Sequence, residues 1–142
     1  MTPVHQIPGK LTVQFEPSLK AVIDTWTSYF VTLDEFKDAV LVKGMGYAHP
    51  RGVQAWIVDS SRAKGAFTPE CQAFIGSDVF PSFAKHGVKY FITINSESAV
   101  TKMTVREYQS KAGPHGLRLV EVRNLSDAFE WLRHELGLKR VA

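Results

Sequence analysis

The chain has 142 residues, a length typical of one domain with a single hydrophobic core. Apolar residues make up 44% of the chain and charged residues 22%, which excludes a disordered or collagen-like protein. The formal net charge of +3 is too small to indicate nucleic-acid binding, and no stretch is apolar for the roughly 18 residues that a membrane span needs. We therefore expect one domain over residues 1–142, with residues 1–9 as a flexible N-terminal tail.

The cysteine content and the N-terminal residues indicate the cellular compartment of the protein. Cys71 is the only cysteine, so the chain can form neither an internal disulfide nor a multi-cysteine zinc site. The first residues lack the basic and then apolar order of a signal peptide. We expect a cytoplasmic protein that does not insert into membranes.

The first elements are a hairpin and a helix. Residues 11–16 alternate apolar and polar side chains, as in a strand with one buried face. Residues 19–30 are rich in β-branched and aromatic side chains and predict a second strand, antiparallel to the first. Thr32 then supplies a capping hydroxyl for a helix over about residues 33–45, where Gly44 weakens it.

The middle of the chain predicts an interior strand and a well-marked helix. Residues 53–58 are nearly all apolar, as in a parallel strand covered on both faces. Residues 68–70 then place a capping threonine, a proline at the first helical position and an acid in the first turn. Pro81 must kink or divide this helix, because proline lacks the amide for an interior helical bond.

The last third repeats this alternation. Residues 88–94 have the buried-strand profile, and Thr104 with Glu107 forms a capping-box pattern that opens a third helix. Residues 117–122 alternate as a shorter strand, and residues 126–127 cap a final amphipathic helix. The whole order predicts an α/β fold with a mixed, mainly parallel sheet, an N-terminal antiparallel hairpin and four helices.

Polar segments follow three of the predicted strands, at 59–61, 95–98 and 123–124. Ligands of open α/β sheets gather beyond the carboxyl ends of the strands, so these segments predict a shared polar surface. The candidate partner-binding residues are Asp59, Ser60, Ser61, Lys64, Thr68 and Ser96. For any single hydroxyl, helix capping or loop support is the simpler role.

The sequence does not predict a catalytic centre. It contains no G-x-S-x-G, H-E-x-x-H or phosphate-binding glycine motif. No histidine is placed beside Ser60, Ser61 or Cys71, so a nucleophile lacks a base. We expect no catalytic residue, metal or cofactor, and a hydrolase that uses Ser60 or Ser61 is the least favoured hypothesis.

The order of elements and the segment WIVDSSRAKGAFT, from Trp56 to Thr68, resemble the STAS domain of bacterial anti-sigma factor antagonists. The resemblance is closer to the SpoIIAA-like bacterial proteins, over residues 53–136, and includes residues 80–85, 90–93 and 102–106. It implies a STAS-like fold and a binding module rather than an enzyme. The implied partner is a protein, such as a kinase or an anti-sigma-type regulator, and a homodimer is also open.

The resemblance also bears on phosphorylation. In the antagonists a kinase modifies a serine of an Asp-Ser-Ser-Gly motif at the start of the second helix. When Asp59 is placed on the family's strand-end aspartate, that serine position falls on Pro69, so this chain departs from the pattern. Thr68 is the nearest hydroxyl, with Arg62 and Lys64 close in sequence to receive a phosphate. Thr68 is thus a candidate phosphorylation site, and a plain helix cap is the alternative.

Two functions follow as expectations. The first is a small cytoplasmic, non-catalytic STAS-like protein-binding or regulatory module, whose working surface comprises residues 60–70 and 95–104. The alternative is a small-molecule or lipid carrier with an apolar pocket between helices and sheet, because large aromatic side chains can line a cavity as readily as fill a core.

Overall fold

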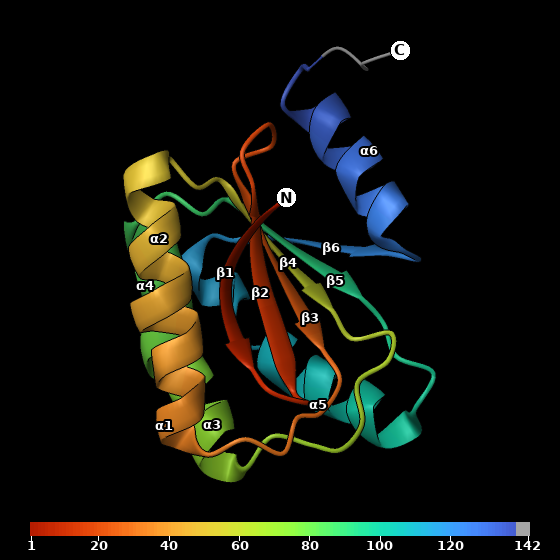
Figure 1. Ribbon diagram of the computed structural model, residues 1–142. Helices are drawn as coiled ribbons and strands as arrows, with labels where there is room; N and C mark the ends of the chain where they lie inside the picture. The colour runs from red at the N-terminus through yellow and green to blue at the C-terminus, as the bar shows by residue number, and fades with distance from the viewer. Residues whose placement is uncertain (139–142) are drawn as a thin grey trace.

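A single six-stranded sheet organises the molecule, as the computed structural model, which describes residues 1–138, shows in Figure 1. The strands lie side by side in chain order. They are β1 (Thr2–Ile7), β2 (Leu11–Glu16), β3 (Ala21–Trp26), β4 (Ala55–Asp59), β5 (Tyr90–Ile94) and β6 (Arg118–Val122). β1, β2 and β3 pair antiparallel, whereas β3 to β6 pair parallel. The predicted α/β class, with its mixed sheet and N-terminal hairpin, is confirmed.

The N-terminus forms an edge strand instead of the expected tail over residues 1–9. β1 pairs with β2 from Thr2 opposite Phe15 to Ile7 opposite Leu11. Gly9 has a φ of 73°, which allows a tight turn, and Lys10 N donates to Ile7 O at 2.9 Å. The Pro-Gly pair before β2 was the available signal for this turn.

Four helical stretches connect or follow the parallel strands. They are α1 (Leu33–Lys37) with the π-helix η1 (Asp38–Met45), α2 (Gly46–Ala48) and the 3-10 helix η2 (His49–Arg51); α3 (Pro69–Phe74) with the π-helix η3 (Ile75–Val79) and α4 (Phe80–Lys85); α5 (Ala99–Gln109), followed by the 3-10 helix η4 (Gly113–His115); and α6 (Leu125–Glu135). Within residues 1–138, no helix is long and apolar enough to cross a bilayer.

Helix boundaries differ from the predictions at three places. The first stretch continues beyond residue 45 through α2 and η2 to Arg51. α5 begins before Thr104, since Ser98 accepts a bond from Thr101 N. Asn124, rather than Ser126, caps α6. At Pro81, where a kink or division was predicted, the helical run stays continuous, and the π-helix η3 ends directly before α4, which holds this proline.

The two faces of the sheet are covered unequally. α1 to α5 and the π-helical segments cover one face, over a core that includes Val22, Trp56 and Phe83. α6 covers part of the other face, where Ile57 and Leu132 are fully buried. β4 lies between β3 and β5, which confirms the predicted interior strand.

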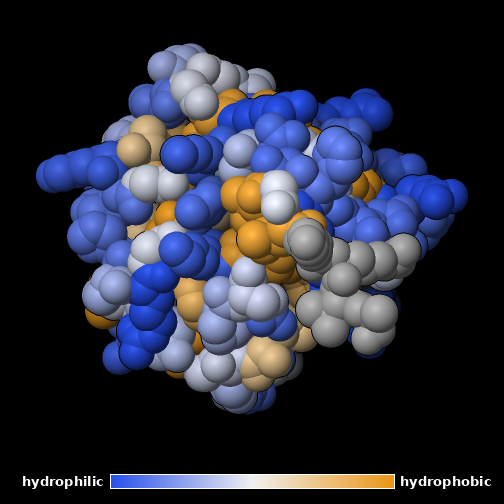
Figure 2. All heavy atoms as spheres, turned by 90° about the horizontal axis from the view of Figure 1, so that it is seen from above, coloured by the Kyte–Doolittle hydropathy of each residue, from blue (hydrophilic) through white to orange (hydrophobic). Residues whose placement is uncertain are grey.

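Figure 2 views the molecule from the amino ends of the parallel strands. Most side chains at this end are hydrophilic, and an apolar area lies near its middle. The carboxyl ends of β3 to β5 lie at the opposite end of the molecule, where the arrows of Figure 1 point. The predicted polar segments therefore gather at that far end.

Candidate functional site

The loop that leaves β4, residues 60–68, is held on both sides. Tyr29 N donates to Lys64 O at 2.9 Å, on the side of β3. On the side of α5, the hydroxyl of Thr101 donates to Ala63 O at 3.2 Å. The loop therefore has a fixed backbone, although it contains no helix or strand of its own.

Two predicted partner-binding residues, Ser60 and Ser96, are buried. Ser60 is fully buried, with its hydroxyl 2.5 Å from the Tyr29 hydroxyl. Ser96 is also buried, donates to Ala63 O at 3.4 Å and accepts from Ser98 N at 3.0 Å. Both side chains point inward because each lies directly beyond a buried strand end, where loop carbonyls and amides need partners. The structure removes Ser60 from the candidate surface, whereas Ser96 is 3% exposed and lines the crevice between the ends of β5 and β6.

The other predicted residues remain at or near the surface. Asp59 is half-buried, and its carboxylate accepts from the amide and hydroxyl of Ser61, at 3.0 and 2.7 Å. Lys64 is exposed. Thr68 is exposed and caps α3, where its hydroxyl accepts from Cys71 N at 3.2 Å. The cap role of Thr68 is thus observed, and its phosphorylation stays a prediction.

Sequence reasoning missed three exposed apolar side chains at this end. Phe30, Val100 and Met103 are 65%, 56% and 71% exposed. The Phe30 ring lies over Gly65, so close that a Cβ there would overlap it. Placing the start of α5 at residue 98 from the sequence would have put Val100 and Met103 three apart on one helix face.

We call this surface the rim. Its exposed members are Phe30, Ser61, Arg62, Lys64, Thr68, Val100, Lys102 and Met103. The basic side chains lie on the loop 60–68 and on α5. The apolar side chains lie on α5 and, for Phe30, on the segment between β3 and α1.

A crevice of about 490 Å³ adjoins the rim between the ends of β5 and β6. The chain turns from β5 to α5 on one face of the sheet and from β6 to α6 on the other, as in the binding crevices of open α/β folds. Lys102 lines this crevice and belongs to the rim, while Arg123 lines it and pairs with Asp127 at 3.3 Å. The crevice therefore extends the rim toward β6.

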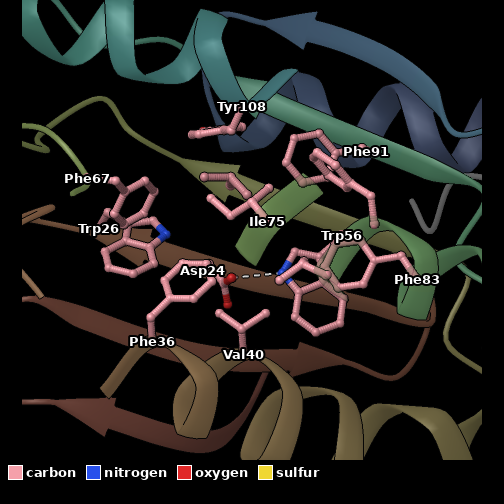
Figure 3. A pocket seen from close by; sticks show the side chains of 13 residues that line it. Asp24, Trp26, Phe36, Val40, Trp56, Phe67, Ile75, Phe83, Phe91 and Tyr108 are labelled. Atoms are coloured by element: carbon pink, nitrogen blue, oxygen red, sulfur yellow. Dashed lines mark hydrogen bonds between the residues drawn. The ribbon is translucent and has the colours of Figure 1, made fainter. Parts of the chain in front are cut away.

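The interior holds a second feature, a cavity of about 30 Å³ between the sheet and the helices (Figure 3). Asp24 of β3 is the one charged side chain that lines it and is 2% exposed. Trp56 Nε1 donates to Asp24 Oδ2 at 2.7 Å, whereas Oδ1 has no partner among residues 1–138. Burial raises the pKa of the Asp24 carboxyl to about 7, and the Trp56 bond opposes this rise.

Buried hydroxyls lie close to Asp24 and Ser60. Tyr29 OH is 2.5 Å from Ser60 Oγ and 3.4 Å from Tyr108 OH. Burial raises the pKa of Tyr29 to about 12 and that of Tyr108 well above its usual value, so both stay neutral near pH 7. Ser60 thus contacts a neutral phenol, not the basic partner that an activated serine needs.

Metal-binding side chains and known relatives give no further guide to the site. Across the described residues, 1–138, no group of three or more His, Cys, Asp or Glu side chains could hold a metal ion. Comparisons with family models, curated proteins and solved structures find no match to the chain.

Proposed function

We propose that the chain is a small protein-binding module that docks its partner through the rim. The observation that supports this most is the loop 60–68, whose backbone is bonded to Tyr29 on one side and Thr101 on the other while Phe30 and Lys64 stay exposed. A surface that is ordered before binding loses little conformational entropy when a partner docks. Exposed aromatic side chains in such surfaces often contribute most of the affinity.

The charges of the rim favour an acidic partner segment. The rim exposes the cations Arg62, Lys64 and Lys102 together with its apolar side chains, and the exposed acids nearest in sequence are Glu70 and Glu97. Complementary charge speeds association and selects partners, while apolar anchors hold the complex. The partner that fits is a protein segment with apolar side chains among aspartates and glutamates.

The proposal extends to the resemblance noted in the sequence. A STAS-like regulatory role in the cytoplasm, with a kinase or anti-sigma-type partner, is consistent with a docking rim at the carboxyl ends of the strands. Thr68 is exposed within this rim, so a partner kinase could reach its hydroxyl. Modification there would cost the cap bond to Cys71 N unless the phosphate replaced it.

Binding of a purified partner to rim variants tests this function. Wild-type protein serves first to capture a partner, whose affinity is then measured by calorimetry. Lys64→Glu and Phe30→Ala should each weaken binding by about tenfold or more, because they remove a charge pair and an aromatic anchor. Lys89→Glu makes the same charge reversal at the amino end of β5 and should leave affinity unchanged. Rim variants that bind as tightly as wild type would contradict the proposal.

A carrier of lipids is less consistent with the interior. Ligand pockets for drug-sized molecules measure roughly 300–1,000 Å³. The cavity beside Asp24 has about 30 Å³, and every side chain that lines it is buried. A bound lipid would hold the helices apart from the sheet, whereas a much smaller ligand fits the cavity as it stands once it has entered.

A further inference from the structure

One oxygen of the Asp24 carboxyl, Oδ1, has no hydrogen-bond partner among residues 1–138, although it needs one in either protonation state. When ionised, Oδ1 needs a donor or a cation, and when neutral, the carboxyl carries a hydroxyl that needs an acceptor. Within residues 1–138, no side chain or backbone group meets Oδ1. Buried carboxylates are normally paired, because an unpaired charge in an apolar interior is costly.

No counter-charge faces this carboxyl from the surrounding elements. The cavity lining contains no lysine, arginine or histidine. Tyr29 and Tyr108 are the titratable groups that interact electrostatically with Asp24, and both are neutral phenols near pH 7. The site therefore has a negative group, and the described protein supplies no positive one.

Aromatic rings form much of the wall opposite and beside the carboxyl (Figure 3). Trp26 stacks on Phe36 with ring centroids 6.1 Å apart, and Phe67 meets Trp26 edge to face at 5.2 Å. Trp56 stacks on Phe83 at 4.3 Å. Aromatic faces attract organic cations, and a carboxylate beside them strengthens that attraction.

Both π-helical segments contribute to the cavity wall. Val40 lies in η1, and Ile75 and Val79 lie in η3. π-Helical turns are rare and occur frequently at functional sites. Because the lining is buried on all sides, we expect these two segments to move when a ligand enters.

We propose that this cavity binds a compact alkylammonium ion, whose N–H group donates to Asp24 Oδ1 and whose methyl group packs against the aromatic rings. A water-sized group needs about 10–15 Å³ of such cavity volume, so about 30 Å³ has room for an ion of about two heavy atoms, as methylammonium has. The ion would provide both the donor and the positive charge that Oδ1 lacks. Binding here is independent of docking at the rim.

Nuclear magnetic resonance of the full chain tests the proposal, with the Trp56 Nε1–H signal as reporter because this group bonds Asp24. Methylammonium chloride, added at pH 8 against matched sodium chloride, should shift this signal with a saturating curve. Affinity should fall about tenfold at pH 6, because a carboxyl with a pKa of about 7 is then mostly protonated. Absence of a saturating shift at pH 8 would overturn the proposal.

Neutral probes and variants separate a cation site from a simple void. Methanol, which is similar in size but uncharged, should not reproduce the shift, and an equal response to methanol would overturn the proposal. Asp24→Asn keeps the size and an acceptor for Trp56 and should abolish binding. Gln72→Met is the matched control, because Gln72 Oε1 is also buried without a partner but does not line the cavity. If Asp24→Asn does not fold, the pH and methanol comparisons on wild type decide.

Discussion

The carboxyl of Asp24 lies on β3 opposite Val13 of β2 and Val58 of β4, in a part of the sheet where both neighbours are apolar. Its one bond is the indole N–H of Trp56, which comes from the adjacent strand. A single bond compensates only part of the desolvation of a carboxylate, so the proton is held more tightly than in water. This residue makes the stability of the fold depend on pH.

We predict that wild type loses stability relative to Asp24→Asn as the pH rises. The folded pKa of about 7 exceeds the ordinary aspartate pKa of 3.8, so between these values the folded state holds a proton that the unfolded state has released. Unfolding then becomes easier with rising pH, by about 3 kcal/mol between pH 5 and pH 8. Urea unfolding of both proteins at the two pH values measures this difference. Parallel pH dependences would show that Asp24 titrates normally.

The burial of Asp24 could not be predicted from the sequence. An aspartate in a β-branched, aromatic run gives no sign of burial, because burial depends on the register that places Val13, Val58 and Trp56 around it. Ser60 was likewise expected at the surface, and its inward direction depends on the distant Tyr29. The surroundings of both residues depend on contacts between segments that are far apart in the sequence.

At the scale of elements, the first helical stretch contains one glycine in a tightly packed position, Gly44, and one in an open position, Gly46. Gly44 is buried, and a Cβ there would lie 3.0 Å from Ala39 O and 3.2 Å from the Trp56 ring. Gly46 is exposed, and a Cβ there would meet nothing within 4 Å. Both have helical neighbours, so intrinsic helix propensity alone would favour alanine at either site.

We predict that Gly46→Ala stabilises the protein by about 0.5–1 kcal/mol, because alanine restricts the unfolded chain and fits the helix. Gly44→Ala should destabilise it by about 1–3 kcal/mol, because the Trp56 ring lies within a packed core and cannot yield freely. Thermal unfolding of the two variants gives the comparison. Equal shifts in the same direction would mean that Gly44 has no packing role.

Elements whose ends carry capping residues or a helix-compatible proline were predicted well, and elements without such residues were not. The start of α3 was identified because Thr68 and Pro69 carry a cap and a helix-compatible proline side by side. β1 was missed because its pairing with β2 uses backbone groups, and its side chains show little alternation. The start of α5 was misplaced because Thr104 has the capping-box spacing, although Ser98 makes the actual cap.

At the scale of the molecule, the two ends of the sheet differ in structure. The amino ends of the parallel strands are preceded by short turns, such as the bend at residues 17–20. The carboxyl ends continue into the fixed loop 60–68, the first turns of α5 and the crevice beside β6. A partner that docks at the carboxyl ends contacts all three at once.

The two proposals also occupy separate parts of the molecule. The rim consists of exposed side chains, whereas the Asp24 cavity is enclosed by buried ones. Variants of one feature should therefore leave the other measurable in the same preparation.

Amide hydrogen exchange of the chain, alone and in complex with the captured partner, tests the central claim most directly. The account predicts that new protection is confined to peptides that contain Phe30 or come from residues 60–68 and 98–104, which together form the rim. Peptides from residues 17–20 and 86–89, at the amino ends of the strands, should exchange equally in both states. Protection at those turns, with the rim unchanged, would contradict the account.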